Sequence, residues 1–256
     1  MIDKKKNILA LFLMASMVIS AIALSGCTQE KGNKIIVGTS ADFPPFEYKD
    51  GSEIVGFDVE MVKSILTSQG YTVEVQDIAF DSLIAALQTN KIDVIVAGMS
   101  ITDERMQEIN FSNPYYEADQ SVLIESESGI TINNESDLEN LIVGVQTGTT
   151  GDDWVFETLV NTSKTPDDKY KKYETYDLAI LDLKAGRLQI IVLDKPVAQA
   201  FSADGDLKIA YTIVTNENYG IGVRKGDTEL LQKINTGLAE LKASADWNTL
   251  VEKYFP

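Results

Sequence analysis

The sequence predicts an α/β protein built from two lobes, each a mostly parallel sheet flanked by helices. The chain has 256 residues, which is enough for two lobes of about 100 residues each. From residue 34 onward, short β-rich runs alternate with amphipathic helical patterns, as in βαβ units whose strands pair in parallel. The alternation occurs twice, before and after a polar stretch at residues 126–135. Apolar residues make up 44% of the chain, which is sufficient for a sizeable core.

The first series of elements predicts the first lobe. In residues 57–69, apolar side chains recur at i, i+4 and i+8 from Phe57, which predicts an amphipathic helix, and Gly70 is a typical helix stop. Asp81 and Thr102 are candidate N-caps of two further helices. The other elements expected in this lobe are strands at 34–38, 71–76 and 92–97 and helices at 81–89 and 102–109.

The second series predicts the second lobe, after which the chain returns to the first. A strand at 219–223 and one or two terminal helices within 228–253 are expected to rejoin the first lobe. We therefore expect the first lobe to comprise residues 34–124 and 215–256, and the second lobe residues 125–214. The elements around and within the second lobe are strands at 119–125, 141–145, 188–193 and 207–214 and helices at 152–160, 177–185 and 196–203.

Charge and composition exclude several classes of function. The formal net charge is −17, from 22 basic and 39 acidic side chains, and such a surface repels phosphate backbones and anionic lipid. The chain has no histidine, which excludes Ser-His-Asp and Cys-His nucleophiles and histidine-ligated zinc. Its single cysteine, Cys27, cannot form an intrachain disulfide or a cysteine metal cluster. We therefore expect no nucleic-acid partner, no metal and no cofactor.

The N-terminus has the pattern of an export signal. A lysine cluster at residues 4–6 precedes an apolar run at residues 8–24, which ends in Leu-Ser-Gly-Cys27. This ending resembles the lipobox of bacterial lipoproteins, in which the signal is cleaved before a cysteine that carries the lipid. We expect a signal peptide at 1–26 and a lipidated Cys27 with its tether at 27–33. The domain would then be anchored to the outer face of a cell membrane or lie in the periplasm. The alternative is a retained membrane anchor.

Two predicted strands end in segments with aromatic or basic side chains. In an open α/β sheet, ligands bind outside the carboxyl ends of the strands. Residues 38–48 hold Phe43 and two other aromatic side chains on a loop that two prolines keep extended. Residues 97–105 end in Arg105, whose guanidinium can donate two hydrogen bonds to a carboxylate. The alternatives are aromatic side chains in the core and an Arg105 that pairs with acidic neighbours on its own helix.

Two further features follow strands of the second lobe. Residues 146–151 place glycines and threonines at a helix start, where free backbone N–H groups can bind an anion. The segment lacks the Gly-Lys-Ser/Thr of a nucleotide-binding loop. Asp194 ends an apolar strand and can either accept an ammonium group or cap the helix opened by Pro196. An arginine, a helix start and a carboxylate at strand ends of two lobes suit a zwitterion, such as an amino acid, in a cleft between the lobes.

Residues 34–256 resemble the polar amino-acid-binding proteins of ABC importers, solute-binding protein family 3. The resemblance implies a type II periplasmic-binding-protein-like fold with a ligand cleft between its lobes. It also implies a monomer that captures an amino acid by interlobe closure, delivers it to a membrane permease with its ATPase, and performs no chemistry. The stretches that carry the resemblance are VGTSADFPPFEYKDGSEIVGFDVEMV, AFDSLIAALQTNKIDVIVAGMSITDERMQEINFSNPYY, VGVQTGTTG and AGRLQIIVLDKPVA.

The resemblance implies a role for each group around the two charges of the ligand. Arg105 would bind the α-carboxylate, together with backbone N–H groups of Ser100 and Thr150, with Thr149 beside the latter. The α-ammonium would be accepted by the Ser100 hydroxyl, the Gly98 carbonyl and the Asp194 carboxylate. Two aromatic rings, Phe43 and Phe80, would enclose the ligand side chain.

The polar end of the expected side-chain pocket departs from the pattern of cation binders. Such binders often carry an aspartate where this chain has Ser40, although Glu47 can take its place. Gln146 would present a neutral amide to the side chain. We therefore expect a polar or cationic side chain, arginine or glutamine before aspartate or glutamate.

Two rival functions remain on the same fold. Some relatives are dehydratases that act on prephenate or arogenate, but the absence of histidine and the intact zwitterion clamp argue against an enzyme. The other rival is the sensor domain of a membrane receptor, which would act through a partner.

Overall fold

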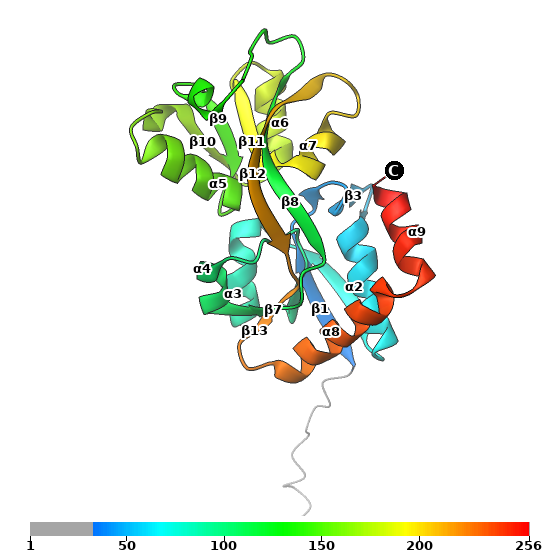
Figure 1. Cartoon of the computed structure of the whole chain (residues 1–256). Helices are drawn as coiled ribbons and strands as arrows, with labels where there is room; N and C mark the ends of the chain where they lie inside the picture. The colour runs from blue at the N-terminus through cyan, green and yellow to red at the C-terminus, as the bar shows by residue number, and fades with distance from the viewer. Residues whose placement is uncertain (1–32, 256) are drawn as a thin grey trace, which may run out of the picture. The chain divides into compact units, whose positions relative to one another are not determined.

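The structure is a computed structural model and describes residues 33–255. The expected signal peptide and the lipidated Cys27 lie outside the described residues. Within residues 33–255, none of the helices combines the length and the apolar character needed to span a bilayer. Two five-stranded sheets and one three-stranded sheet organise these residues (Figure 1).

The first sheet has the strand order β5-β1-β6-β13-β7. β1 (Lys34–Thr39) pairs in parallel with β5 (Thr72–Asp77) and β6 (Val94–Ile95). β13 (Gly222–Arg224) is antiparallel to β6 and to β7 (Ile109–Phe111). A late segment of the chain therefore completes this sheet, as the expected return to the first lobe requires.

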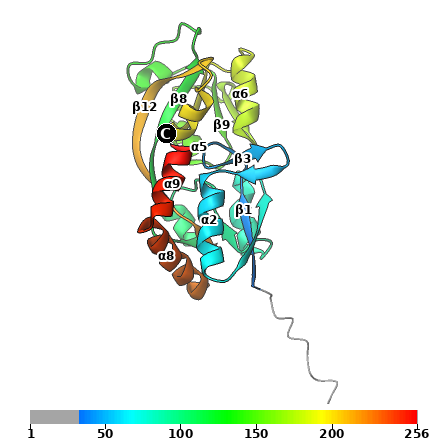
Figure 2. The ribbon, with the colours of Figure 1, turned by 90° about the vertical axis from the view of Figure 1, so that its right-hand side faces the viewer.

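Helices cover this sheet, and a small sheet extends from it. α2 (Phe57–Ser68), α8 (Thr228–Lys242) and α9 (Ala245–Tyr254) pack against one another, as Figure 2 shows. The 3-10 turn η1 (Phe80–Ser82), α3 (Leu83–Gln88) and α4 (Asp103–Glu108) follow strands of the same sheet. We call these elements the first lobe, together with the small sheet of β2 (Asp42–Phe43), β3 (Glu47–Asp50) and β4 (Glu53–Val55).

The second sheet has the strand order β10-β9-β11-β8-β12. β9 (Val143–Gln146) is parallel to β10 (Tyr170–Tyr173) and β11 (Ile190–Asp194), whereas β8 (Tyr116–Glu125) is antiparallel to β11 and β12 (Leu207–Tyr219). We call this sheet the second lobe, together with the remaining helical elements. These are the turn η2 (Glu135–Leu138), α5 (Thr150–Val155), the π-helix η3 (Phe156–Val160), the turn η4 (Asp167–Lys169), α6 (Tyr176–Lys184) and α7 (Lys195–Phe201).

Two long antiparallel strands, β8 and β12, connect the lobes (Figure 1). Their lower ends reach the first lobe, where Ser100 forms an isolated bridge with Tyr219. The expected lobe boundaries at 124/125 and 214/215 fall inside these strands and stay a prediction. The chain changes sheets between Phe111 and Tyr116 and again between Tyr219 and Gly222.

Glycine is required where α2 begins. Gly56 has φ 129°, and a Cβ atom there would lie 2.1 Å from the Phe46 carbonyl oxygen. A side chain is therefore excluded both by the backbone conformation and by the neighbouring strand. The close approach places Phe46 and Glu47 against the start of α2, with Phe46 O accepting the N–H of Asp58 at 2.9 Å.

Several expectations about single elements are wrong in detail. The strand expected at 207–214 continues to Tyr219 as β12, and the strand expected at 219–223 begins only at Gly222, as the short β13. The central strand expected at 92–97 pairs only over β6, although the residues around it are buried as expected. The helix expected at 152–160 starts earlier, at α5, and ends as the π-helix η3.

Candidate functional site

Arg105 lies between the two lobes. α4 begins after Thr102, whose hydroxyl accepts the N–H of Arg105 at 3.2 Å, as expected of an N-cap. This start directs the guanidinium into the protein, where it donates to the carbonyls of Ser100 and Gly148, both at 2.9 Å. Only 8% of Arg105 is exposed, so the expected alternative of a surface arginine paired on its own helix is wrong.

The bond from Arg105 to Gly148 joins α4 of the first lobe to the α5 start of the second. Gly148 has φ 78°, and a Cβ there would lie 3.1 Å from the Asp81 Cβ atom, so the lobes approach closely here. Asp81 makes no capping bond to α3, which corrects the expectation that it caps this helix. Burial lowers the pKa of Arg105, which nevertheless remains a cation because guanidinium groups do not lose their proton in proteins.

The predicted anion seat is the start of α5. Thr149 is its N-cap, and its hydroxyl accepts the N–H of Asp152 at 3.1 Å. The Thr150 hydroxyl instead donates to Glu217 Oε2 at 2.6 Å. Asp152 Oδ2 accepts the Gly148 N–H at 3.0 Å, so a side chain of α5 already uses one donor of this loop.

Asp194 lies at the N-cap position of α7 but forms no side-chain cap there. Its carboxylate instead accepts the Tyr219 hydroxyl at 2.7 Å and the Gln120 amide. Burial, and then the Glu217 carboxylate, raise the pKa of Asp194 well above its usual range. The predicted role of Asp194 as a helix cap is therefore wrong. Its carboxylate is buried and faces the strands between the lobes, and its role as an acceptor of an ammonium group stays a prediction.

Glu217 is a central group of this region that the sequence analysis missed. Its carboxylate accepts hydrogen bonds from the Ser100 hydroxyl at 2.5 Å, the Thr150 hydroxyl at 2.6 Å and the Gln120 amide at 3.0 Å. These donors belong to the first lobe, the second lobe and a connecting strand. Two groups predicted to bind the ligand, Ser100 and Thr150, thus meet at one carboxylate.

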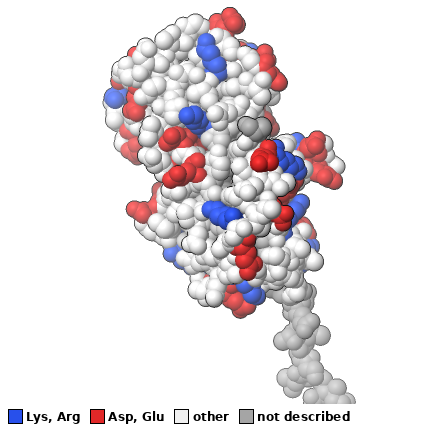
Figure 3. All heavy atoms as spheres, turned by 45° about the vertical axis from the view of Figure 1, so that its right-hand side comes forward, with Lys and Arg blue, Asp and Glu red and all other residues white. Residues whose placement is uncertain are grey.

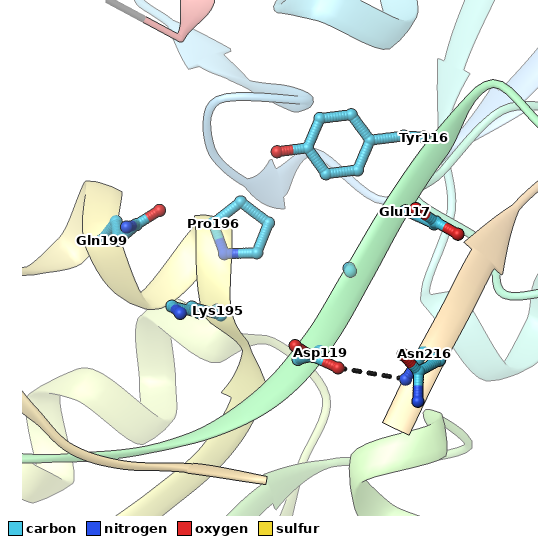
Figure 4. A pocket seen from close by; sticks show the side chains of 8 residues that line it. Tyr116, Glu117, Asp119, Lys195, Pro196, Gln199 and Asn216 are labelled. Atoms are coloured by element: carbon cyan, nitrogen blue, oxygen red, sulfur yellow. Dashed lines mark hydrogen bonds between the residues drawn. The ribbon is translucent and has the colours of Figure 1, made fainter. Parts of the chain in front are cut away.

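An irregularity in β12 positions Glu217. The register with β8 shifts between Ile213 and Glu217. Asp119 Oδ1 accepts the N–H groups of Thr215 at 2.9 Å and Asn216 at 3.0 Å, the latter shown in Figure 4. The cavity of about 270 Å³ in Figure 4 is lined by β8, β12 and α7 and includes none of the predicted site residues.

The aromatic groups lie at the other end of the site. Phe43 is buried and stacks on Tyr176 of α6, with ring centroids 5.8 Å apart. Gly98 has φ 51°, and a Cβ there would lie 2.6 Å from the Phe43 ring. Phe80 lies under the guanidinium of Arg105, whose Cζ is 5.3 Å from the ring centroid. That Phe43 and Phe80 enclose a ligand side chain stays a prediction.

Ser40 and Gln146 meet at Asp42, another group that the sequence analysis missed. The Ser40 hydroxyl donates to Asp42 Oδ1 at 2.8 Å, and Gln146 Nε2 donates to Oδ2 at 3.0 Å. The backbone N–H of Tyr176 also donates to Oδ2, at 2.6 Å. Burial raises the pKa of Asp42 to about 6, and these hydrogen bonds partly oppose the shift.

Glu47 is a buried carboxyl group without a donor. It has 0% exposure, and neither of its oxygens accepts a hydrogen bond from the described residues. Its side chain instead contacts the Asp58 carboxyl group, and this contact raises the pKa of Glu47 and lowers that of Asp58, so Glu47 holds the proton that the pair shares. Asp58 has donors, because the Gly98 N–H and the Tyr115 hydroxyl both reach its Oδ2, at 2.9 and 2.5 Å.

Burial dominates the electrostatics of this acidic group. It raises the pKa of Asp58 to about 6. Burial, followed by the carboxylates of Asp58 and Asp42, raises the pKa of Glu47 well above its usual range.

The surface of the protein is not uniformly acidic, since acidic and basic side chains are interspersed on the face in Figure 3. The described residues hold no cluster of acidic side chains arranged to bind a metal ion.

The structure therefore brings the predicted residues together in two groups. Arg105, Ser100, Thr150 and Asp194 surround Glu217 and Gln120, and Phe43, Ser40 and Gln146 surround Asp42 and Tyr176. Glu47 and Gly98 are connected through Asp58. Asp42 and Glu217 had a signal in the sequence, since each is an acidic residue within a segment that follows or forms a predicted strand, but similar acidic residues are common along this chain.

The comparisons with known proteins agree on one family. The family model for bacterial extracellular solute-binding proteins, family 3, matches residues 35–256. The chain is 32% identical to the arginine-binding extracellular protein ArtP of Bacillus subtilis, with 98% of each chain covered. It is similar in structure to an ancestral arginine-binding protein bound to arginine, with a TM-score of 0.82, 38% identity, and 88% and 99% coverage. It is also similar to an ancestral arginine-binding protein bound to glutamine, with a TM-score of 0.80, 39% identity, and coverage of 87% of this chain and 98% of that chain. The chain belongs to the bacterial extracellular solute-binding proteins of family 3.

Proposed function

We propose that this protein is the lipid-anchored, extracytoplasmic binding component of an ABC importer and that it captures an amino acid with a cationic side chain, arginine first. The observation that carries the choice of ligand is Glu47, a fully buried carboxyl group to which no described N–H or O–H group donates. In the described residues Glu47 contacts the carboxyl group of Asp58, a buried pair that needs a proton, and a cationic ligand can take the place of that proton. A guanidinium supplies both the charge and several donors.

The acidic surroundings of Glu47 favour a cation over a neutral side chain. Carboxyl groups of Asp42, Asp58 and Asp194 contribute to this environment, and burial raises the pKa of each. A cationic ligand would favour the ionised form of these groups, whereas an anionic ligand would add one more negative charge. Aspartate and glutamate are therefore the least favourable ligands for this site.

The other end of the site suits the two charges common to all amino acids. Arg105 donates two bonds to protein carbonyls, and a guanidinium has five N–H donors, so donors remain for an α-carboxylate. Asp194 and Glu217 supply carboxylates for an α-ammonium. We infer that Arg105 and Asp194 hold opposite ends of one zwitterion and that no covalent chemistry follows.

Glutamine is the second candidate ligand. Gln146 places an amide beside Asp42, and a similar solved structure, an ancestral arginine-binding protein, contains glutamine. The relative from Bacillus subtilis is named for arginine. A protein with a pocket for a long polar side chain would accept both, with the charge of Glu47 deciding the order.

A thermal-shift screen of the twenty amino acids tests the choice of ligand, because a ligand stabilises the folded state by mass action. Arginine should produce the largest shift, followed by other cationic side chains and glutamine, and calorimetry should confirm one site. Tight binding of aspartate or glutamate, with none of arginine, lysine or glutamine, would contradict the proposal.

The anchor is tested separately. If Cys27 carries the lipid, Cys27→Ser should move the protein from the membrane fraction to the soluble fraction and abolish lipid labelling. Ser25→Ala is a suitable control, since it leaves the cysteine in place. A Cys27→Ser protein that stays in the membrane fraction would support the retained-anchor alternative.

A further inference from the structure

Asp42 is the point where the small sheet of the first lobe meets the second lobe. It lies in β2 and is 4% exposed. Its carboxylate accepts the Tyr176 N–H at the first residue of α6 and the amide of Gln146 at the end of β9, at 2.6 and 3.0 Å. Both donors belong to the second lobe and lie 134 and 104 residues further along the chain.

The third donor keeps the carboxylate in place. The Ser40 hydroxyl, from the same loop, donates to Asp42 Oδ1 at 2.8 Å. An aspartate that accepts from a hydroxyl, an amide and a backbone N–H is well satisfied as an anion without any further partner. The Tyr176 N–H is also one of the helix N-terminal donors that have no partner within the helix, so the carboxylate satisfies α6 as well.

Asp42 differs in this respect from Glu47 and from Arg105. Glu47 has no described donor, which suits a group that awaits a cationic ligand. Arg105 bridges the lobes too, through Gly148, but has N–H groups left for a ligand. Asp42 alone of the three is both interlobe and fully occupied by protein donors. Phe43, the next residue, stacks on the Tyr176 ring, so a second contact between the lobes lies beside that of Asp42.

We propose that Asp42 is a positioning residue that latches the second lobe over the ligand site, without touching the ligand side chain. The inference rests on the proposed function, because interlobe closure is the step that it serves. Interactions that favour the closed arrangement strengthen binding of any ligand that needs closure, and by a common factor. Asp42 should therefore set the affinity for arginine and glutamine together and leave their ratio unchanged.

Charged groups around the latch do not replace it. Lys49 forms an ion pair with Asp77 at 2.6 Å rather than with Asp42, and Asp177 adds a repulsive carboxylate. The charged or titratable side chains that face Asp42 from the surrounding elements are Glu47, Lys49, Asp77, Glu174, Tyr176 and Asp177.

The first test compares two ligands by calorimetry on the full chain. Asp42→Ala should weaken arginine and glutamine binding alike, by about 10- to 100-fold, since hydrogen bonds to a charged group are lost. Asp42→Asn keeps the shape of the side chain and one acceptor oxygen, so its affinities should lie between those of the unmodified protein and those of Asp42→Ala. Asp177→Ala is the matched control. It removes an exposed carboxylate at the start of α6, the helix that Asp42 contacts, and this variant should bind both ligands like the unmodified protein.

Three outcomes of this test overturn the latch. Unchanged affinities in Asp42→Ala would show that the contact does not support binding. Loss of arginine binding with glutamine binding retained would make Asp42 part of the side-chain pocket. A lower Tm with unchanged affinities in both Asp42 variants would reduce Asp42 to a structural residue. If the unmodified protein binds no amino acid at all, the proposed function fails instead.

The second test needs no ligand. Spin labels at Lys91→Cys and Lys164→Cys, in a Cys27→Ser background, report the distance between exposed positions on the first and second lobes. Asp42→Ala should shift the distance distribution to longer values, and Asp177→Ala should not. Identical distributions in all three proteins would overturn the latch even if no ligand is known.

Discussion

Asp42 and Glu47 are two carboxyl groups five positions apart in one small sheet, and their surroundings are opposite. Both are buried, and burial raises the pKa of both. Asp42 is surrounded by donors, two of them from the second lobe, whereas Glu47 has none among the described residues. Since both groups are buried acids, only the hydrogen-bond donors around them distinguish a carboxylate that joins the two lobes from one that we propose to bind a ligand.

The same distinction applies to the two ends of the site. At the end around Arg105, carbonyls of both lobes accept two of the guanidinium N–H groups and hydroxyls of both lobes donate to Glu217, and in the proposed function the remaining N–H groups bind the α-carboxylate common to all amino acids. At the end around Glu47, a buried acid has no donor among the described residues, and in the proposed function this end discriminates between side chains. Substitutions around Arg105 should therefore lower the affinity for all amino-acid ligands, whereas substitutions of Glu47 should lower the affinity for cationic ligands.

The largest effect is expected at the common end. Arg105→Ala should weaken every amino-acid ligand by about 30-fold to several thousand-fold, because a charge buried with it is left unpaired. Asp194→Ala should act similarly, and the two effects should be coupled, since either loss disfavours the closed arrangement. Calorimetry of both single variants and the double variant measures this. Unchanged affinity in Arg105→Ala would remove the site assignment.

The next effect should be selective. Glu47→Gln keeps the size of the side chain but removes its charge, so arginine affinity should fall by about 10- to 100-fold. Glutamine affinity should stay within about threefold, because its side chain carries no charge to lose a partner. Calorimetry with the two ligands checks the ratio, and Glu53→Gln, on the exposed side of β4, is the control. Equal losses of affinity for both ligands would contradict the proposal that Glu47 recognises the charge of the ligand side chain.

A pH titration should give the same division without a mutation. Burial raises the pKa of Glu47 and Asp194, and that of Asp58 to about 6, so these groups hold protons at low pH. A bound guanidinium lowers the pKa of Glu47 and Asp58, so arginine binding releases protons and strengthens as the pH rises through the pKa of each group, which for Asp58 is about 6, by up to about tenfold per unit and proton. Glutamine binding should depend less on pH, because only Asp42, with a pKa of about 6, and Asp194 act on both ligands alike. Parallel pH profiles for the two ligands would argue against a cation site.

The smallest effect concerns the helix that carries Arg105. Thr102→Ala removes an observed N-cap and should lower the free energy of unfolding by about 1 kcal/mol. Asp81→Ala removes a carboxylate that caps nothing and should change it by less than about 0.5 kcal/mol. Urea denaturation of both variants measures the difference. Similar losses would mean that Asp81 supports α3 by a route other than capping.

The sequence alone determined the features that depend on near neighbours. The alternation of strands and helices predicted an α/β fold, and the Thr102 cap and its position relative to Arg105 follow from residues three apart. Local patterns also located the loops that carry Ser100, Thr150, Gln146 and Asp194. The similarity of these loops to a known family supplied the roles that spacing could not.

The contacts of the charged groups depend on residues that are distant in the chain. Asp42 meets Tyr176 across 134 residues, Ser100 meets Glu217 across 117, and the choice for Asp194 between a helix cap and a buried acceptor depends on Gln120 and Tyr219. Pattern and propensity act within one turn or one strand, whereas a hydrogen bond between lobes depends on how both sheets are placed. The partners of a buried carboxylate, and with them its pKa and its role, are therefore properties of the fold rather than of the segment that carries it.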